Sequence, residues 1–136
     1  MLQKLSGETN AINWFEIPVE DIERGKRFYE KVLDIELVVP PSEDTDEEMA
    51  LFPRLPDTIM GLSGKVSGAL VKGKLRKTGQ SGVLIYLNAS PSIQPAIDRV
   101  ESAGGKIIVN RTQIPAGFIA VILDTEGNQV GLHAAE

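Results

Sequence analysis

Two side chains near the start of the chain, Trp14 and Glu16, are the first candidates for a functional site. They stand two residues apart in an apolar segment, so a strand there places both on the face opposite Phe15, Ile17 and Val19. If that face lines a pocket, the carboxylate of Glu16 lies among apolar groups, which raises its pKa and lets it act as a base or as a ligand anchor. The alternative is a charge at the rim of a sheet, paired with an arginine.

Trp14 is the only tryptophan and His133 the only histidine. The indole of Trp14 provides either a stacking wall for a ligand or an ordinary core residue. Strand alternation places His133 on the face of Gly131, where it could donate to a ligand or share a metal with Glu16; an exposed position near the chain end is the alternative. Two ligands seldom hold a metal. The absence of cysteine excludes disulfides, thiolate zinc sites and cysteine nucleophiles, and no nucleophile-elbow or phosphate-loop motif is present.

Composition narrows the class of partner. The 136 residues fit one domain, and 14 Lys+Arg against 19 Asp+Glu give a formal net charge of −5. Binding to nucleic acid needs clustered positive charge, so we expect no nucleic-acid partner. No apolar run approaches the roughly 20 residues that span a bilayer, and the first ten residues lack the apolar centre of a signal peptide. We therefore expect no membrane partner and a cytoplasmic location.

The elements that must position these residues occur twice along the chain. One offset of 71 residues (86 − 15) aligns strand, helix cap and helix face in the pairs Phe15 and Tyr86, Asp21 and Ser92, Ile22 and Ile93, Tyr29 and Val100. A repeat of this length predicts two related modules packed as one domain over residues 1–136, with a site in the cleft between them. Module one covers about 10–72, a linker about 73–81, and module two about 82–135.

Each module reads β-α-β-β-β. Apolar periodicity predicts strands at about 11–18, 35–39, 48–52 and 66–72 around a helix at 22–33, then strands at about 82–88, 106–110, 117–123 and 128–133 around a helix at 92–103. Asp21 is a good N-cap for the first helix. Gly and polar residues mark the linker, whose Lys74, Arg76 and Lys77 are expected simply to face solvent.

The segment Phe-Glu-Ile-Pro-Val-Glu-Asp-Ile-Glu-Arg-Gly-Lys-Arg-Phe-Tyr at 15–29, with Asp-Thr-Glu-Gly-Asn-Gln-Val-Gly-Leu-His at 124–133, resembles the vicinal oxygen chelate superfamily. That superfamily includes glyoxalase I, bleomycin-resistance proteins and extradiol dioxygenases. The resemblance covers about residues 10–134. It implies an α+β fold in which two βαβββ modules pair into a curved, barrel-like mixed sheet with helices outside, enclosing a pocket, usually in a homodimer. It does not fix a reaction, because one fold hosts many functions.

The resemblance also implies a divalent ion held by His or Glu on four strands. The motif places Trp14, Ile85 and Gly131 at three of these positions, and the fourth strand, residues 66–71, contains no Asp, Glu or His. None of these side chains can coordinate a cation. We therefore expect no metal and no cofactor.

The sequence thus predicts a metal-independent binder of a small hydrophobic or aromatic molecule. Trp14 would supply stacking area, Glu16 and His133 polar anchors, and Met49 or Phe52 a lining, depending on which strand face turns inward. Sequestration of a toxic compound is one role for such a protein. Two alternatives stay open: a metal-dependent lyase or dioxygenase with displaced ligands, and a non-catalytic dimeric interaction module. Whether the chain is an enzyme is not decided by its sequence.

Overall fold

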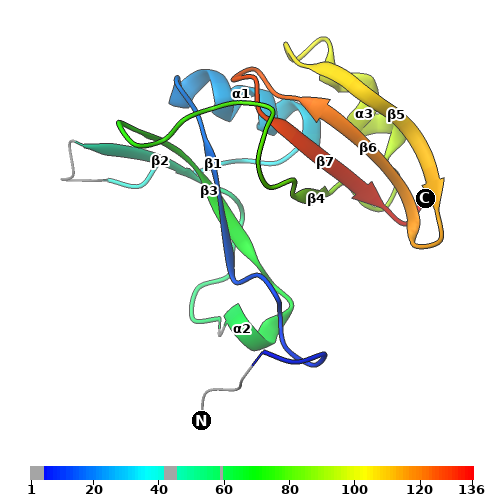
Figure 1. The fold of residues 1–136 in the computed structure, drawn as a ribbon. Helices are drawn as coiled ribbons and strands as arrows, with labels where there is room; N and C mark the ends of the chain where they lie inside the picture. Colours follow the sequence, from blue (N-terminus) through cyan, green and yellow to red (C-terminus); the bar gives the residue numbers. More distant parts are fainter. Residues whose placement is uncertain (1–4, 42–45, 59) are drawn as a thin grey trace.

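The computed structural model describes residues 5–41, 46–58 and 60–136 and has an α+β fold. Two β-sheets are covered by helices α1 and α3, while the short helix α2 lies apart from both (Figure 1). In chain order the elements are β1 (Trp14–Pro18), α1 (Ile22–Leu33), β2 (Glu47–Leu51), α2 (Met60–Ser63), β3 (Ser67–Gly73), β4 (Tyr86–Asn88), α3 (Gln94–Val100), β5 (Lys106–Ile114), β6 (Gly117–Leu123) and β7 (Gln129–Ala134). Within the described ranges, no helix has the length and apolar character needed to cross a membrane.

The two sheets have matching strand orders. The first is β1-β3-β2 and the second is β4-β7-β6-β5. In each sheet the first strand of the module runs parallel to its last strand, as β1 does to β3 and β4 to β7, and the other pairs are antiparallel. This shared order supports the repeat inferred from the sequence.

One predicted strand of the first module is wrong. The segment 35–39 forms only an isolated antiparallel bridge, in which Val38 and Leu51 exchange backbone hydrogen bonds of 3.0 and 2.7 Å. Pro40 and Pro41 follow directly. Because proline has no backbone N–H, the ladder cannot continue beyond the bridge.

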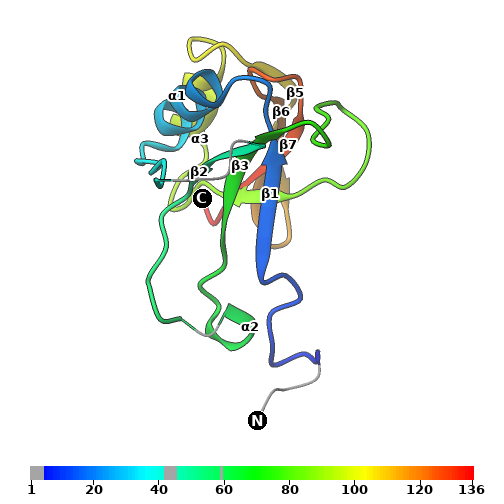
Figure 2. The same ribbon diagram turned by 90° about the vertical axis from the view of Figure 1, so that its left-hand side faces the viewer.

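The prediction of one barrel-like sheet is not confirmed. Neither sheet is closed, and no ladder in the described ranges joins one to the other. Figure 2 shows β1 and β3 passing in front of the second sheet rather than continuing it. Among the edge strands, β4 has only three residues and offers little backbone for a further pairing.

Helix α1 has the boundaries that its sequence predicts. Asp21 is its N-cap, and the Asp21 carboxylate accepts a hydrogen bond of 3.0 Å from the backbone N–H of Arg24. The buried stripe of the helix consists of Ile22, Gly25, Phe28, Tyr29 and Val32. This stripe packs on β2 and β3 of the first sheet and on α3, so α1 forms because its apolar face is buried against them.

The offset of 71 aligns the buried faces of the helices, where Ile22 and Ile93 are both buried, but the first strands are shifted by one residue. The second module is also less regular than predicted, because α3 covers only part of the helix expected at 92–103 and β4 only part of the strand expected at 82–88. Lys31 Nζ donates to the backbone O of Ser102 at 3.1 Å, and these two residues are related by the offset of 71. In the strands, however, the core residues Ile17 and Val19 correspond to Leu87 and Ala89, an offset of 70. The alignment of Phe15 with Tyr86 is therefore wrong, and the half-exposed Tyr86 lies on the face away from the core.

The carboxylate of Glu126, in a turn of the second module, holds the start of helix α1 in the first. It accepts hydrogen bonds from the backbone N–H groups of Glu20 (2.8 Å) and Asp21 (2.9 Å), and Arg24 Nε lies 2.7 Å from it. The Glu126 side chain is fully buried. Burial by itself would raise the pKa of Glu126, but Arg24 and the two amides outweigh it and lower this pKa to about 2.

The same turn is fixed by a second buried polar residue, Asp124. The Tyr29 hydroxyl donates to Asp124 Oδ2 at 2.7 Å, and the backbone N–H of Asn128 donates to Asp124 Oδ1 at 2.8 Å. Asn128 Nδ2 in turn donates to the backbone O of Pro18 at 2.6 Å. The end of β1 and the start of β7 are therefore joined by side chains rather than by a ladder.

Candidate functional site

A cleft of about 610 Å³ lies between the two modules. Strand β1 forms one wall, the residues around the start of β7 form another, and part of the linker between β3 and β4 covers it. We call it the Trp14 cleft, and it is lined by Ile12, residues 14–18, 77–79 and 128–130, Ser81, Val83 and Ile85. The structure thus has a cavity where the sequence analysis expected one, between the modules.

Trp14 and Glu16 both line this cleft. The core contains Ile17 and Val19, with Phe15 packed against it, so the strand places Trp14 and Glu16 on the opposite face as predicted. Trp14 Nε1 donates to Glu16 Oε2 at 3.2 Å. Because its only polar atom is satisfied, Trp14 presents an apolar ring to the cleft.

Glu16 is paired with an arginine of the linker. Its Oε1 lies 2.7 Å from Arg76 Nη1, and Arg76 Nε donates to Glu47 Oε2 on β2 at 2.9 Å. The expectation that Arg76 simply faces solvent is therefore wrong, because two strands of the first sheet bind its guanidinium. Glu16 matches the alternative reading of a sheet-rim carboxylate paired with an arginine.

The linker is held at a second point, three residues further on. The backbone N–H of Gly79 donates to Asn128 Oδ1 at 3.0 Å. Since Arg76 is fixed by β1 and β2 and Gly79 by the turn before β7, the segment between them is held beside the cleft. None of these three contacts could be predicted from local sequence, because the partners are far apart in the chain. The separations are 29 residues for Glu47 and Arg76, 49 for Gly79 and Asn128, and 60 for Glu16 and Arg76 (76 − 16).

The other three candidate residues lie elsewhere. Phe52 is 7% exposed and makes edge-to-face contacts with Phe15 and Tyr29, so it belongs to the core. His133 Nε2 lies 2.8 Å from the backbone O of Ala116, at the hairpin between β5 and β6. His133 is not among the residues that line the Trp14 cleft. The structure therefore does not bring His133 to Glu16.

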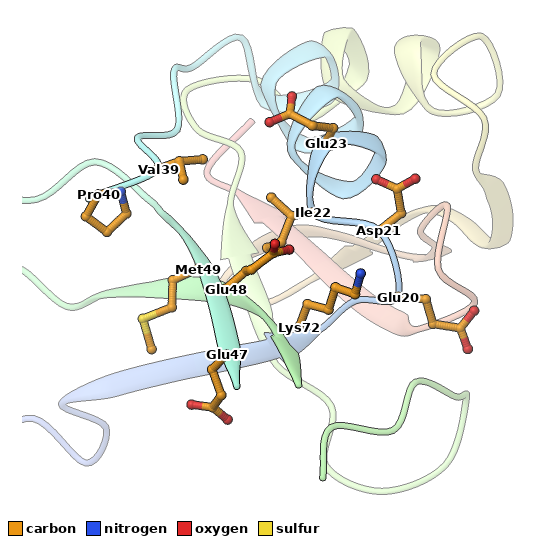
Figure 3. A pocket seen from close by; sticks show the side chains of 10 residues that line it. All are labelled: Glu20, Asp21, Ile22, Glu23, Val39, Pro40, Glu47, Glu48, Met49 and Lys72. Carbon is orange, nitrogen blue, oxygen red and sulfur yellow. The ribbon is translucent and has the colours of Figure 1, made fainter. Parts of the chain in front are cut away.

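Met49 lines a separate groove of about 700 Å³ beside the start of α1 (Figure 3). In that view Glu48 extends from β2 toward Ile22, while Met49 and Glu47 extend to the other side of the strand. Pairing of Met49 with Val71 and of Val71 with Pro18 puts Met49 on the sheet face of Trp14. It nevertheless contributes to the groove and not to the cleft.

The family is decided by a match along most of the chain. The family model of the Glyoxalase/Bleomycin resistance protein/Dioxygenase superfamily matches residues 11–132. The chain belongs to this superfamily. No curated protein matches it by sequence at a significant level.

Solved structures show the same fold at low sequence identity. A hypothetical protein from S. aureus is 20% identical, with a TM-score of 0.66, and the match covers 98% of this chain and 95% of that one. A glyoxylase/bleomycin resistance protein/dioxygenase domain from Frankia sp. EAN1pec is 17% identical, with a TM-score of 0.65 and coverage of 98% and 100%. Glyoxalase I from Zea mays is 20% identical, with a TM-score of 0.63; the match covers 90% of this chain but only 45% of the maize protein. At these identities the likeness concerns the fold.

The residues present do not fit the divalent ion that the superfamily fold implies. Trp14 is hydrogen-bonded through its N–H. The strand offset of 70 puts Leu84 rather than Ile85 at the position equivalent to Trp14, and neither alkyl side chain can coordinate a cation. A Cβ built at Gly131 would lie 2.4 Å from Tyr86 Cδ1, so the tyrosine ring occupies the space of a side chain at that position. Within the part of the chain that the structure describes, no three His, Cys, Asp or Glu residues are grouped so that they could hold a metal. The donor set is therefore wrong for such an ion.

Proposed function

We propose that this protein binds a small hydrophobic or aromatic molecule in the Trp14 cleft without a metal ion. One observation carries the proposal: a half-buried indole, with its N–H already satisfied by Glu16, lines a cleft of about 610 Å³. Ile12, Val83 and Ile85 add apolar surface to the same lining. A concave site with an aromatic wall and few polar groups suits a ligand that is recognised mainly by burial.

Substitution of Trp14 tests whether this residue contacts the ligand or only stabilises the fold. Trp14→Ala should weaken binding of a naphthalene probe at least about tenfold, since stacking area is lost. It should lower the free energy of unfolding by only about 1–2 kcal/mol, below the 3–5 kcal/mol expected for a fully buried aromatic. Binding is measured by calorimetry and stability by urea denaturation. Leu75→Ala is the control, because Leu75 is 93% exposed and outside the cleft.

The opposite pattern would reject the site. If Trp14→Ala were strongly destabilising while Trp14→Phe kept the fold and bound the probe as the wild type does, Trp14 would be a packing residue. If the wild type bound no aromatic probe at all, the proposed function itself would be wrong.

We also propose that the chain forms a homodimer. Support comes from apolar side chains outside the cleft that the single chain leaves uncovered at and next to β4: Tyr86 is 48% exposed and Leu84 36%. Covering such residues with a second copy would remove apolar surface from water.

A further inference from the structure

We infer that the ligand of the Trp14 cleft carries an anionic group, and that Lys77 is the residue that selects it. This inference rests on the proposed function and adds the charge of the ligand to it. It follows from the charged groups of the cleft, from the way Lys77 is held, and from the overall charge of the protein.

Only two residues that line the cleft are charged, Glu16 and Lys77. Both oxygens of Glu16 are engaged, Oε1 by Arg76 at 2.7 Å and Oε2 by Trp14 Nε1 at 3.2 Å. Lys77 has no hydrogen bond or ion pair with any residue of the described ranges. Lys77 is therefore the charged residue of the lining that a ligand can still neutralise.

The backbone holds Lys77 at this place. It follows Arg76, which is bound to carboxylates of β1 and β2, and it lies two residues before Gly79, which is bound to Asn128. A segment fixed at both ends loses less backbone freedom on meeting a ligand than a free loop does. The linker thus carries a cation to the edge of an apolar cleft.

The remaining polar side chains do not compete for this role. Asn128 already uses its amide for Pro18 and Gly79. Thr78, Ser81 and Gln129 are neutral and can add hydrogen bonds without setting a preference for charge. An aromatic body against Trp14 with a carboxylate or similar anion toward Lys77 is the ligand that complements both features.

The net charge of the protein favours ligands of the opposite charge to those that Lys77 would favour. With a formal net charge of −5, the long-range field favours cations over anions. A preference for an anion would therefore have to come from a local group. The general field and Lys77 predict opposite orders of affinity for probes that differ only in charge.

The experiment uses three probes with the same aromatic body: 2-naphthoate, 2-naphthylmethanol and 2-naphthylmethylamine, titrated by calorimetry at pH 7. The wild type should bind 2-naphthoate about threefold more tightly than the alcohol, the size expected of a solvent-exposed ion pair, and the amine most weakly. Lys77→Gln should make the carboxylate and the alcohol equal, and Lys77→Arg should keep the preference. Salt at 0.5 M should reduce it.

Lys74→Gln is the matched control, because it removes the same charge from the same linker at a position outside the cleft lining. It should leave the preference intact. Equal binding of all three probes, or an unchanged preference in Lys77→Gln, would overturn the role of Lys77 and leave the hydrophobic cleft standing. Failure of all three probes to bind would overturn both proposals.

Discussion

Replacement of Glu126 by glutamine tests the buried contact that joins the two modules. The substitution removes the charge from a side chain that accepts hydrogen bonds from Glu20 N and Asp21 N and pairs with Arg24 at 2.7 Å. In the folded protein the pKa of Glu126 is lowered from 4.5 to about 2. That difference corresponds to about 3 kcal/mol of stability at pH 7.

The contribution depends on pH with a definite sign. Since the folded-state pKa is below the unfolded value, the stabilisation is complete above pH 4.5 and is lost as the pH falls toward 2. Glu126→Gln should therefore lower the free energy of unfolding by about 3 kcal/mol at pH 7 and by only about 1.5 kcal/mol at pH 3. Urea denaturation of both proteins at the two pH values gives the comparison.

A matched variant controls for the loss of charge alone. Glu20 is exposed and close to Arg24 in sequence, and Glu20→Gln should change the stability by less than about 0.5 kcal/mol. The reasoning would be refuted if Glu126→Gln cost less than about 1 kcal/mol at pH 7, or if its cost were the same at both pH values.

Three further predictions concern packing, metal and assembly. Gly68→Ala should destabilise the fold by about 3 kcal/mol, because the added Cβ would lie 2.3 Å from the backbone O of Phe15. Gly131→Ala should cost only about 1 kcal/mol, since the half-exposed Tyr86 ring can move away; equal costs of the two substitutions in urea denaturation would contradict this. Protein purified without chelator should contain no stoichiometric divalent ion by elemental analysis, and added metal should leave the melting temperature unchanged; one ion per chain would show that we have misassigned the ligands. Light scattering at micromolar concentration should give twice the 14.7 kDa of one chain, whereas the mass of a single chain would exclude the dimer.

The parts of the fold that local sequence determines were predictable. Helix α1 was placed correctly, because its cap, Asp21, and its apolar stripe are both encoded within thirteen residues. The phase of β1, and with it the shared face of Trp14 and Glu16, followed from strict alternation. The prediction of a strand at 35–39 was wrong because Pro40 and Pro41, which have no backbone N–H, prevent the pairing from extending beyond Val38.

The polar contacts of the site were beyond local reasoning. Glu126 and Arg24 are 102 residues apart. The composition of residues 124–128 predicts a turn, but it does not show that the Asp124 and Glu126 carboxylates bind Tyr29 and Arg24 of the other module. The one-residue shift between strand and helix offsets was hidden because Ile85 and Tyr86 are both plausible core residues. Two acids in a turn next to apolar strands were the signal that could have suggested buried anchors.

The contact between Lys31 and Ser102 shows how two separate copies of one module could pack together. Equivalent positions of the two modules touch each other there, so the helix interface of one module is complementary to the same surface on its copy. A protein of half this length would present that surface to an identical partner as an isologous twofold interface. In the present chain one linker joins the two modules, so its residues, Arg76 at Glu16 and Lys77 at the cleft, have no counterpart related by the repeat.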